Sequence, residues 1–407
     1  FPTRRSSDLP IMKYIGGTGL LGSGQLGETV ERELPLLDVS QVEDINLISA
    51  LFRDYTLLAS SYLLEPCDLE FKRTGQYCQG RKVLPKNIAI PLFLLTKKLK
   101  IHPFMEYELS YVFKNWARKD PKAPLSFENL RPVRTFEGGT SEAGFILSQV
   151  SAALHTGDLV STVDHVFKAA ETQDYNDLSA AFYELQAVLR KINEDKEAMW
   201  QRSAPLDYVN FTTFAMGIRN HSLFPNGVIY EGVSDKPRAF RFSSRVNDSI
   251  IPTVDSLLGL SQRIPKDFRP YTLHSEYVGW VESKAKYLSV KELALSSQRT
   301  ALLYLSILNQ VKELRLRYWM FLKDYILESP THPSINMNYP LGTWLQNQLG
   351  NMLQVMEETS KVIDEMSVGD PLDPMSRSLK EDLDSRILSQ KKILEGDLQE
   401  FQGDDYN

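Results

Sequence analysis

Apolar residues recur at three- and four-residue spacing through most of this chain, and this periodicity constrains the fold more than any other feature. The strongest example runs from Ser296 to Leu327 and is followed by Pro330. Such spacing gathers apolar side chains on one face of an α-helix, and a proline ends a helix because its ring blocks the backbone hydrogen bond. Further helices are predicted over 40–64 (ending at Pro66), over 141–163 (capped by Ser141), over 175–200 and over 345–366. We therefore predict an all-α protein without a strand-rich region.

Changes in pattern divide the chain into four predicted parts. Residues 1–12 begin without Met and lack apolar periodicity, so we expect a non-native or disordered leader. A small, mostly helical and irregular N-terminal domain is expected over 13–127, and a large helical domain over 128–370. The tail, 371–407, has apolar residues at helical spacing, which predicts a peripheral helix that packs on the body or on a partner. These apolar residues are Leu379, Leu383, Ile387, Leu394 and Leu398.

A glycine-rich segment near the start has the spacing of a dinucleotide-binding turn. Gly17, Gly19 and Gly22 fit G-x-G-x-x-G. Such a site needs a helix that opens at the glycines, so that its free N–H groups meet the pyrophosphate. Gly24 and Gly27 follow at once and would cost that helix about 1 kcal/mol each, and no βαβ alternation comes after them. We therefore expect a flexible arm here and not a nucleotide site.

Composition excludes several classes of function. The chain has 407 residues and a net charge of −6 with both signs well mixed, whereas nucleic-acid partners select a basic face. No stretch reaches about 18 uninterrupted apolar residues, so no membrane span is expected. Cys67 and Cys78 could pair, but so few cysteines fit a reducing compartment better. We expect a soluble, cytoplasmic protein that is a monomer.

The block from 81 to 129 carries the most specific pattern. Its order is a basic stretch, an apolar turn between Pro85 and Pro91, a predicted amphipathic helix with Tyr107, Tyr111 and Trp116, and a Lys-Asp-Pro stop. The spacing by itself indicates no chemistry. The block resembles the indoleamine 2,3-dioxygenase family, whose members are haem enzymes. This resemblance implies haem b as cofactor, and the rest of the chain has to supply an iron ligand.

A haem needs one strong axial ligand, an apolar pocket and an open sixth position for O₂. Six histidines are available. His155 and His165 fall on the helix predicted from Ser141, where a histidine is more often a surface residue. His274 lies in 269–283, where a proline-rich stretch leads into a short helix with an apolar face. The pattern alone does not decide whether His274 is the iron ligand or an ordinary buried or exposed histidine.

Further motifs match the same family in the same order. Arg269, Tyr271, His274, Tyr277 and 281–283 resemble the segment that carries the proximal histidine, and His274 is thereby implied as the ligand of the haem iron. Other similar stretches are Gly227–Gly232, Asp255–Gly259, Arg315 with Tyr318, Lys323–Ile326 and Gly342-Thr343. The resemblance covers about residues 40 to 366. It implies cleavage of the indole C2–C3 bond of L-tryptophan, or a related indole, by O₂ to N-formylkynurenine, with an external reductant.

The resemblance also assigns a substrate pocket, position by position. Tyr107 and Phe145 are implied to line the indole. Gln149, with Ser148 beside it, stands where mammalian members have a distal serine. The Gly-Thr pair, Gly342 and Thr343, resembles a mobile loop near the substrate.

Other pocket positions depart from the family. Tyr208 and Thr212 stand where members often have Phe and then a carboxylate-binding Arg, and Thr cannot replace a guanidinium. Ser244 and Arg245 belong to a replaced haem-edge loop, in which Arg245 could contact a haem propionate, the substrate carboxylate or only solvent. Two alternatives to tryptophan dioxygenase therefore stay open. One is a divergent haem protein that acts on another indole or on none, and the other is a helical interaction protein without haem.

Overall fold

The computed structural model describes residues 19–215, 217–219, 222–240, 249–260, 275–328 and 341–401. The side chains of residues 107, 108, 275, 341–343 and 399–401 lie outside this description. The leader predicted at 1–12 also lies outside the described residues, and so do His274, Ser244 and Arg245.

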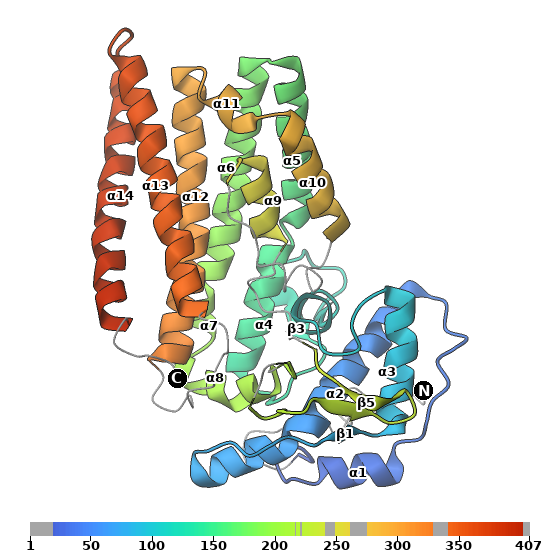
Figure 1. Ribbon diagram of the computed structural model, residues 1–407. Coiled ribbons are helices and arrows are strands. Elements are labelled where there is room, and N and C mark those ends of the chain that lie inside the picture. Colours follow the sequence, from blue (N-terminus) through green and yellow to red (C-terminus); the bar gives the residue numbers. More distant parts are fainter. Residues whose placement is uncertain are drawn as a thin grey trace.

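The N-terminal part combines helices with short strands (Figure 1). Its helices are α1 (Leu26–Glu33), α2 (Ile45–Thr74), α3 (Lys86–Leu99), the π-helix η2 (Tyr107–Phe113) and the 3-10 helix η3 (Phe127–Asn129). Strand β1 (Val83–Leu84) pairs parallel with β4 (Val228–Tyr230), which pairs antiparallel with β5 (Ser234–Arg238). Strand β2 (Trp116–Arg118) pairs antiparallel with β3 (Leu130–Pro132). A segment from 228–238 thus completes a sheet that begins near residue 83.

Long helices form the rest of the molecule, with α12, α13 and α14 side by side at one edge (Figure 1). The helices from α4 to α9 are α4 (Thr140–Ala153), α5 (Thr156–Thr172), α6 (Tyr175–Glu197), α7 (Met199–Arg202), α8 (Pro205–Thr212), η4 (Thr213–Ala215) and α9 (Ile250–Leu257). Those that follow are α10 (Ser275–Tyr287), α11 (Val290–Ala294), α12 (Gln298–Leu322), the π-helix η7 (Lys323–Leu327), α13 (Leu341–Ser367) and α14 (Pro374–Phe401). The all-α prediction is confirmed.

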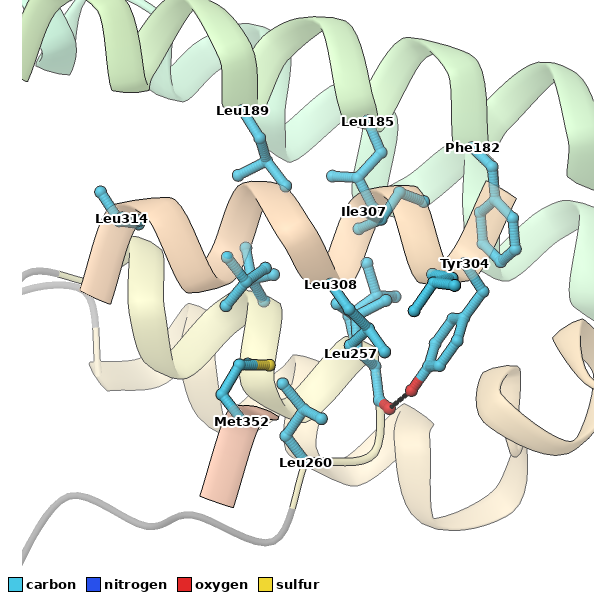
Figure 2. Packing of buried hydrophobic residues seen from close by; sticks show 14 of the residues in the cluster. Phe182, Leu185, Leu189, Leu257, Leu260, Tyr304, Ile307, Leu308, Leu314 and Met352 are labelled. Atoms are coloured by element: carbon cyan, nitrogen blue, oxygen red, sulfur yellow. Dashed lines mark hydrogen bonds between the residues drawn. The ribbon is translucent and has the colours of Figure 1, made fainter. Parts of the chain in front are cut away.

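The buried side chains form two hydrophobic clusters. One fills the helical body between α5, α6, α9, α12, α13 and α14. In Figure 2, Leu185 of α6 and Leu308 of α12 face this cluster, and the Tyr304 hydroxyl donates to the Leu258 carbonyl at 2.6 Å. The other cluster fills the N-terminal part and takes in one face of α4, residues from 199–230, Phe321 and Tyr325. The domain division predicted at residue 127 stays a prediction.

One predicted helix end and one predicted turn were wrong, because Pro66 and Pro91 lie inside helices. Helix α2 continues through Pro66 to Thr74, and α3 contains Pro91 where an apolar turn was expected. Pro66 has no N–H to donate to the Tyr62 carbonyl four residues earlier. The guanidinium of Arg81, from the following loop, donates to that carbonyl instead. A tertiary contact thus replaces the lost backbone bond and lets the helix continue.

The block from 81 to 129 also folds differently from its prediction. Tyr107 and Tyr111 lie in the π-helix η2, but Trp116 lies in strand β2.

The helix predicted over 141–163 is two helices, because α4 ends at Ala153 and α5 begins at Thr156. Ser141 is not its cap, since Gly139 precedes the helix and the Ser141 hydroxyl accepts from the Ala204 N–H at 3.0 Å.

The predicted flexible arm is wrong from residue 19 onward. Residues 19–24 form a turn that buries Leu21, and α1 follows. The buried Glu65 carboxylate accepts from the N–H groups of Leu26 at 2.8 Å and Gly27 at 3.0 Å. A Cβ on Gly27 would lie 2.2 Å from the Arg81 guanidinium that pairs with Glu65, so this close approach requires glycine. The N–H groups at the start of α1 therefore already bind an anion, the Glu65 carboxylate, which belongs to the protein itself.

The tail forms helix α14, as predicted. Leu383, Ile387 and Leu394 are buried in the cluster of the helical body, and Leu398 packs against it, whereas Leu379 is 39% exposed. Helix α14 therefore packs on the body of its own chain.

Candidate functional site

Five aromatic side chains from four elements meet beside α4, and we call them the aromatic cluster. They are Phe145 of α4, Tyr208 and Phe211 of α8, Phe321 of α12 and Tyr325 of η7. The Phe145 ring centroid lies 5.4 Å from Tyr208, 5.5 Å from Phe211 and 6.0 Å from Phe321. Four of these rings are buried, and Tyr208 is partly exposed. Tilted and edge-to-face rings at such distances attract one another and form an apolar wall.

A buried carboxylate orders the side of this wall that η2 contributes. Glu142, in the first turn of α4, accepts from the backbone N–H groups of Phe136 at 2.8 Å, Glu137 at 2.7 Å and Gly138 at 3.3 Å. It also accepts from the Tyr111 hydroxyl at 2.8 Å. Burial raises the pKa of Glu142, and these donors oppose that shift. Glu142 thereby fixes the Tyr111 ring, whose centroid lies 6.3 Å from that of Phe145.

Polar side chains line a small cavity one helical turn from Phe145. The Lys196 ammonium, at the end of α6, donates to Gln149 Oε1 at 3.5 Å and to the Tyr318 hydroxyl at 3.3 Å. Gln149 Nε2 donates to Met199 Sδ at 3.5 Å. Gln149 is buried, and the same cavity is lined by Trp200. The chain thus sets an amide and an ammonium next to an aromatic wall.

Helix α8 carries Tyr208 and Thr212, which stand where Phe and Arg were expected from the family. The Tyr208 ring touches Phe145, Phe321 and Tyr325. Thr212, one turn later, is buried. The structure thus joins Phe145 with Tyr208 directly, while Gln149 contacts Lys196 and Met199.

Unpartnered hydroxyls accompany these residues. Within the described part of the chain, the hydroxyl oxygens of Ser148 and Ser151 on α4 and of Tyr277 on α10 are buried without a hydrogen-bond partner, as are those of Tyr55 and Ser61 on α2. Buried polar groups are nearly always paired. Unpaired hydroxyls on the helix that carries Phe145, and on the helix that directly follows His274, are therefore consistent with a site for a group that the chain does not itself provide.

Two of the histidines in the described ranges, His155 and His165, have carboxylate partners. His155 Nε2 lies 3.1 Å from Asp195. His165 pairs with Glu184 at 2.9 Å and with Asp177 at 3.0 Å, and these hydrogen bonds raise its pKa. No group of three metal-binding side chains occurs among the residues that the structure describes. Gly342 and Thr343 lie in the first turn of α13.

Sequence reasoning missed several residues of this site. Phe211, Phe321 and Tyr325 were not assigned to it, nor was Lys196. The available signal was the four-residue spacing of Phe321 and Tyr325, which also fits an ordinary helix core.

The fold and the candidate site together define a helical protein with a buried aromatic wall beside α4 and, in its sequence, a histidine just before α10. A model of the indoleamine 2,3-dioxygenase family matches residues 12–338, and the chain belongs to this family. The match includes the aromatic cluster and His274, while α13 and α14 lie beyond it.

Two of the individual relatives carry the name of the family, and a third is named a myoglobin. The chain is 29% identical to indoleamine 2,3-dioxygenase 1 of Mus musculus over 61% of this chain and 58% of the relative. It is 26% identical to indoleamine 2,3-dioxygenase 2 of Homo sapiens, over 61% of this chain and 63% of the relative. It is also 23% identical to a myoglobin of Haliotis madaka, over 56% of this chain and 57% of the relative. The match thus spans less than two thirds of each of these relatives. Among the described helices, none has the length and apolar character needed to cross a membrane.

Proposed function

We propose that the protein is a haem-dependent dioxygenase that cleaves the indole C2–C3 bond of L-tryptophan with O₂ and yields N-formylkynurenine, the first step of the kynurenine pathway. The observation that carries this proposal is the family match over 12–338, which contains Phe145, Gln149, Tyr208, Thr212 and His274. The aromatic cluster supports it, because an indole ring needs a flat apolar wall.

The residues would divide the binding work by their chemistry. Phe145 and Tyr208 would hold the indole and exclude water, and Tyr107 is proposed to line the same side. Gln149, whose amide has two N–H donors and one acceptor, would donate toward the reacting end of the substrate. The Lys196 ammonium accounts for the orientation of that amide, since it donates to Gln149 Oε1; Nε2 donates one N–H to Met199 Sδ, and its second N–H would be the one offered to the substrate.

The residues present fit a haem. His274 would hold the iron, and the helix that follows it, α10, is anchored by Val278 and Val281, which are buried. When bound, a ferrous haem supplies the activation of O₂. The unpartnered hydroxyls of Ser148 and Ser151 would provide hydrogen bonds near that group. Arg245 is proposed to contact a haem propionate or the substrate carboxylate, and an external reductant would keep the iron ferrous.

A second candidate is a haem protein of the same fold without dioxygenase activity. Two observations favour it. One relative is named a myoglobin, and Thr212 replaces the residue type that would pair with a substrate carboxylate. In this second candidate His274 would still bind the haem iron, but the protein would have no binding site for tryptophan.

Turnover assays on the purified full chain separate these candidates. Haem-loaded protein is incubated with L-tryptophan, O₂ and ascorbate, and N-formylkynurenine is followed by its absorbance. Product formation that stops when haem is left out supports the dioxygenase. A Soret band without product supports the second candidate. A protein that takes up no haem under reconstitution would contradict both candidates. The remaining alternative would then be a helical interaction protein without haem. A cytoplasmic location and a monomeric state stay predictions.

A further inference from the structure

One acidic side chain of α14, Asp397, forms hydrogen bonds with the end of α12 and the start of η7. Asp397 is only 12% exposed. It accepts from the indole N–H of Trp319 at 2.6 Å and from the Lys323 ammonium at 3.0 Å. Charge-assisted hydrogen bonds to a carboxylate this well buried are stronger than surface ion pairs. The tail helix, which lies beyond the family match, is thereby attached to the helix that ends in η7.

The segment from Trp319 to Tyr325 presents two faces. Trp319 and Lys323 are four residues apart and share one face, which α14 covers. Phe321 and Tyr325 are also four residues apart and share the opposite face. They belong to the aromatic cluster, with their ring centroids 4.7 Å apart. The same turn of helix therefore carries the contact with α14 on one side and a wall of the candidate site on the other.

The backbone here has the looser π-helical pattern. At the end of η7, the N–H of its capping residue Glu328 donates to the Lys323 carbonyl five residues earlier, at 2.9 Å. Single π-turns are rare and are frequently found at functional sites. Two anchors hold η7 on the site side, because the Tyr325 hydroxyl donates to the Ser203 carbonyl at 2.5 Å and Asp324 accepts from Trp200 at 2.6 Å. On the other side, Asp397 holds Lys323 at 3.0 Å, and Lys323 also pairs with Glu328 at 3.5 Å, so Asp397→Asn is the variant that tests the α14 contact alone.

We propose that Asp397 is a positioning residue, through which α14 holds η7 and thereby sets the place of Phe321 and Tyr325 in the substrate pocket. The pocket role rests on the proposed function. The hold on η7 stands on the contacts alone. Without the Asp397 contact, the π-turn opens more often, and the aromatic wall that it carries loses its fixed distance from Phe145.

The test compares two variants that break this contact from opposite ends, Asp397→Asn and Lys323→Met, with a matched control. The control is Glu357→Gln, which removes the ion pair between Glu357 of α13 and Lys391 of α14 and leaves η7 untouched. Hydrogen exchange at 323–327 is measured on the haem-loaded full chain by mass spectrometry, together with KM and kcat for L-tryptophan. Hydrogen exchange can be measured without turnover, so it tests the Asp397 contact by itself. A failure of the proposed function would be seen separately, because the protein without substitutions would then form no product.

In both test variants we expect exchange at 323–327 to be about tenfold faster than in the control. KM for L-tryptophan is expected to rise about fivefold, with kcat changed much less, because binding and not chemistry is affected. Exchange that stays as slow in Asp397→Asn and Lys323→Met as in the control overturns the proposal. Faster exchange with a KM equal to that of the control removes Asp397 from any role in the pocket.

Discussion

The guanidinium of Arg315 and the carboxylate of Asp255 form two hydrogen bonds inside the helical body, at 2.6 and 2.7 Å. Both residues are buried, and Arg315 also donates to the Gln348 carbonyl of α13 at 3.2 Å. The pair joins α9, α12 and α13, so it fixes the helix that leads toward the 261–274 segment.

Removal of one partner of this pair is expected to be costly. Asp255→Leu should lower the free energy of unfolding by about 3–5 kcal/mol, because it leaves a buried guanidinium without its anion. The double variant Asp255→Leu/Arg315→Met should lose less than the sum of the single losses. Urea unfolding of the three variants gives these values. Losses that simply add would show that the two groups do not interact.

The Glu142 contacts predict a graded effect on stability. Tyr111→Phe removes one hydrogen bond and should cost about 1 kcal/mol, whereas Glu142→Ala leaves three backbone N–H groups and one hydroxyl without an acceptor and should cost at least about 3 kcal/mol. Denaturant unfolding measures both. If the two variants lose the same stability, Glu142 does not organise the 136–138 turn.

Buried Glu106 predicts a pH dependence of stability. Burial raises the pKa of its carboxyl from 4.5 to about 7. Between these values the folded state keeps a proton that the unfolded state releases, so the free energy of unfolding falls as pH rises from 4.5 to 7. The total loss is on the order of 3 kcal/mol. Glu106→Gln should flatten this slope, as measured by melting temperature between pH 4.5 and 8. A variant that keeps the full slope would assign it to another group.

The iron ligand is testable without turnover. His274→Ala should lose the Soret band of a five-coordinate, histidine-ligated haem, whereas His165→Ala should keep it, because His165 is already paired with Glu184 and Asp177. Absorbance spectra of both reconstituted variants decide. Stoichiometric haem with an unchanged axial-histidine spectrum in His274→Ala would refute the assignment.

The carboxylate partner of the substrate gives the final prediction. If Arg245 supplies the charge that Thr212 lacks, Arg245→Ala should raise KM for L-tryptophan by roughly 10- to 150-fold, which corresponds to the 1.5–3 kcal/mol of a charge-assisted bond. Tryptamine has no carboxylate, so its KM should change little. Equal changes for both substrates would make Arg245 structural, and no change would remove it from the site.

Local pattern determined the helical nature of the chain, because apolar spacing in α6, α12, α13 and the tail helix depends only on neighbours within a turn or two. The ordered motifs also indicated the family before any geometry was known. These features are encoded along the chain, so they were accessible from it.

Only the tertiary structure decided what depends on residues far apart. Pro66 lies inside α2 because Arg81 donates to the carbonyl that the proline leaves free. The aromatic cluster forms because Phe145 and Phe321, 176 positions apart (321 − 145), are brought to 6.0 Å by the packing of α4 and α12. Asp397 reaches Trp319 only once α14 has folded back. A side chain's spacing predicts the face on which it lies, but its partner is chosen by packing, which no local pattern records.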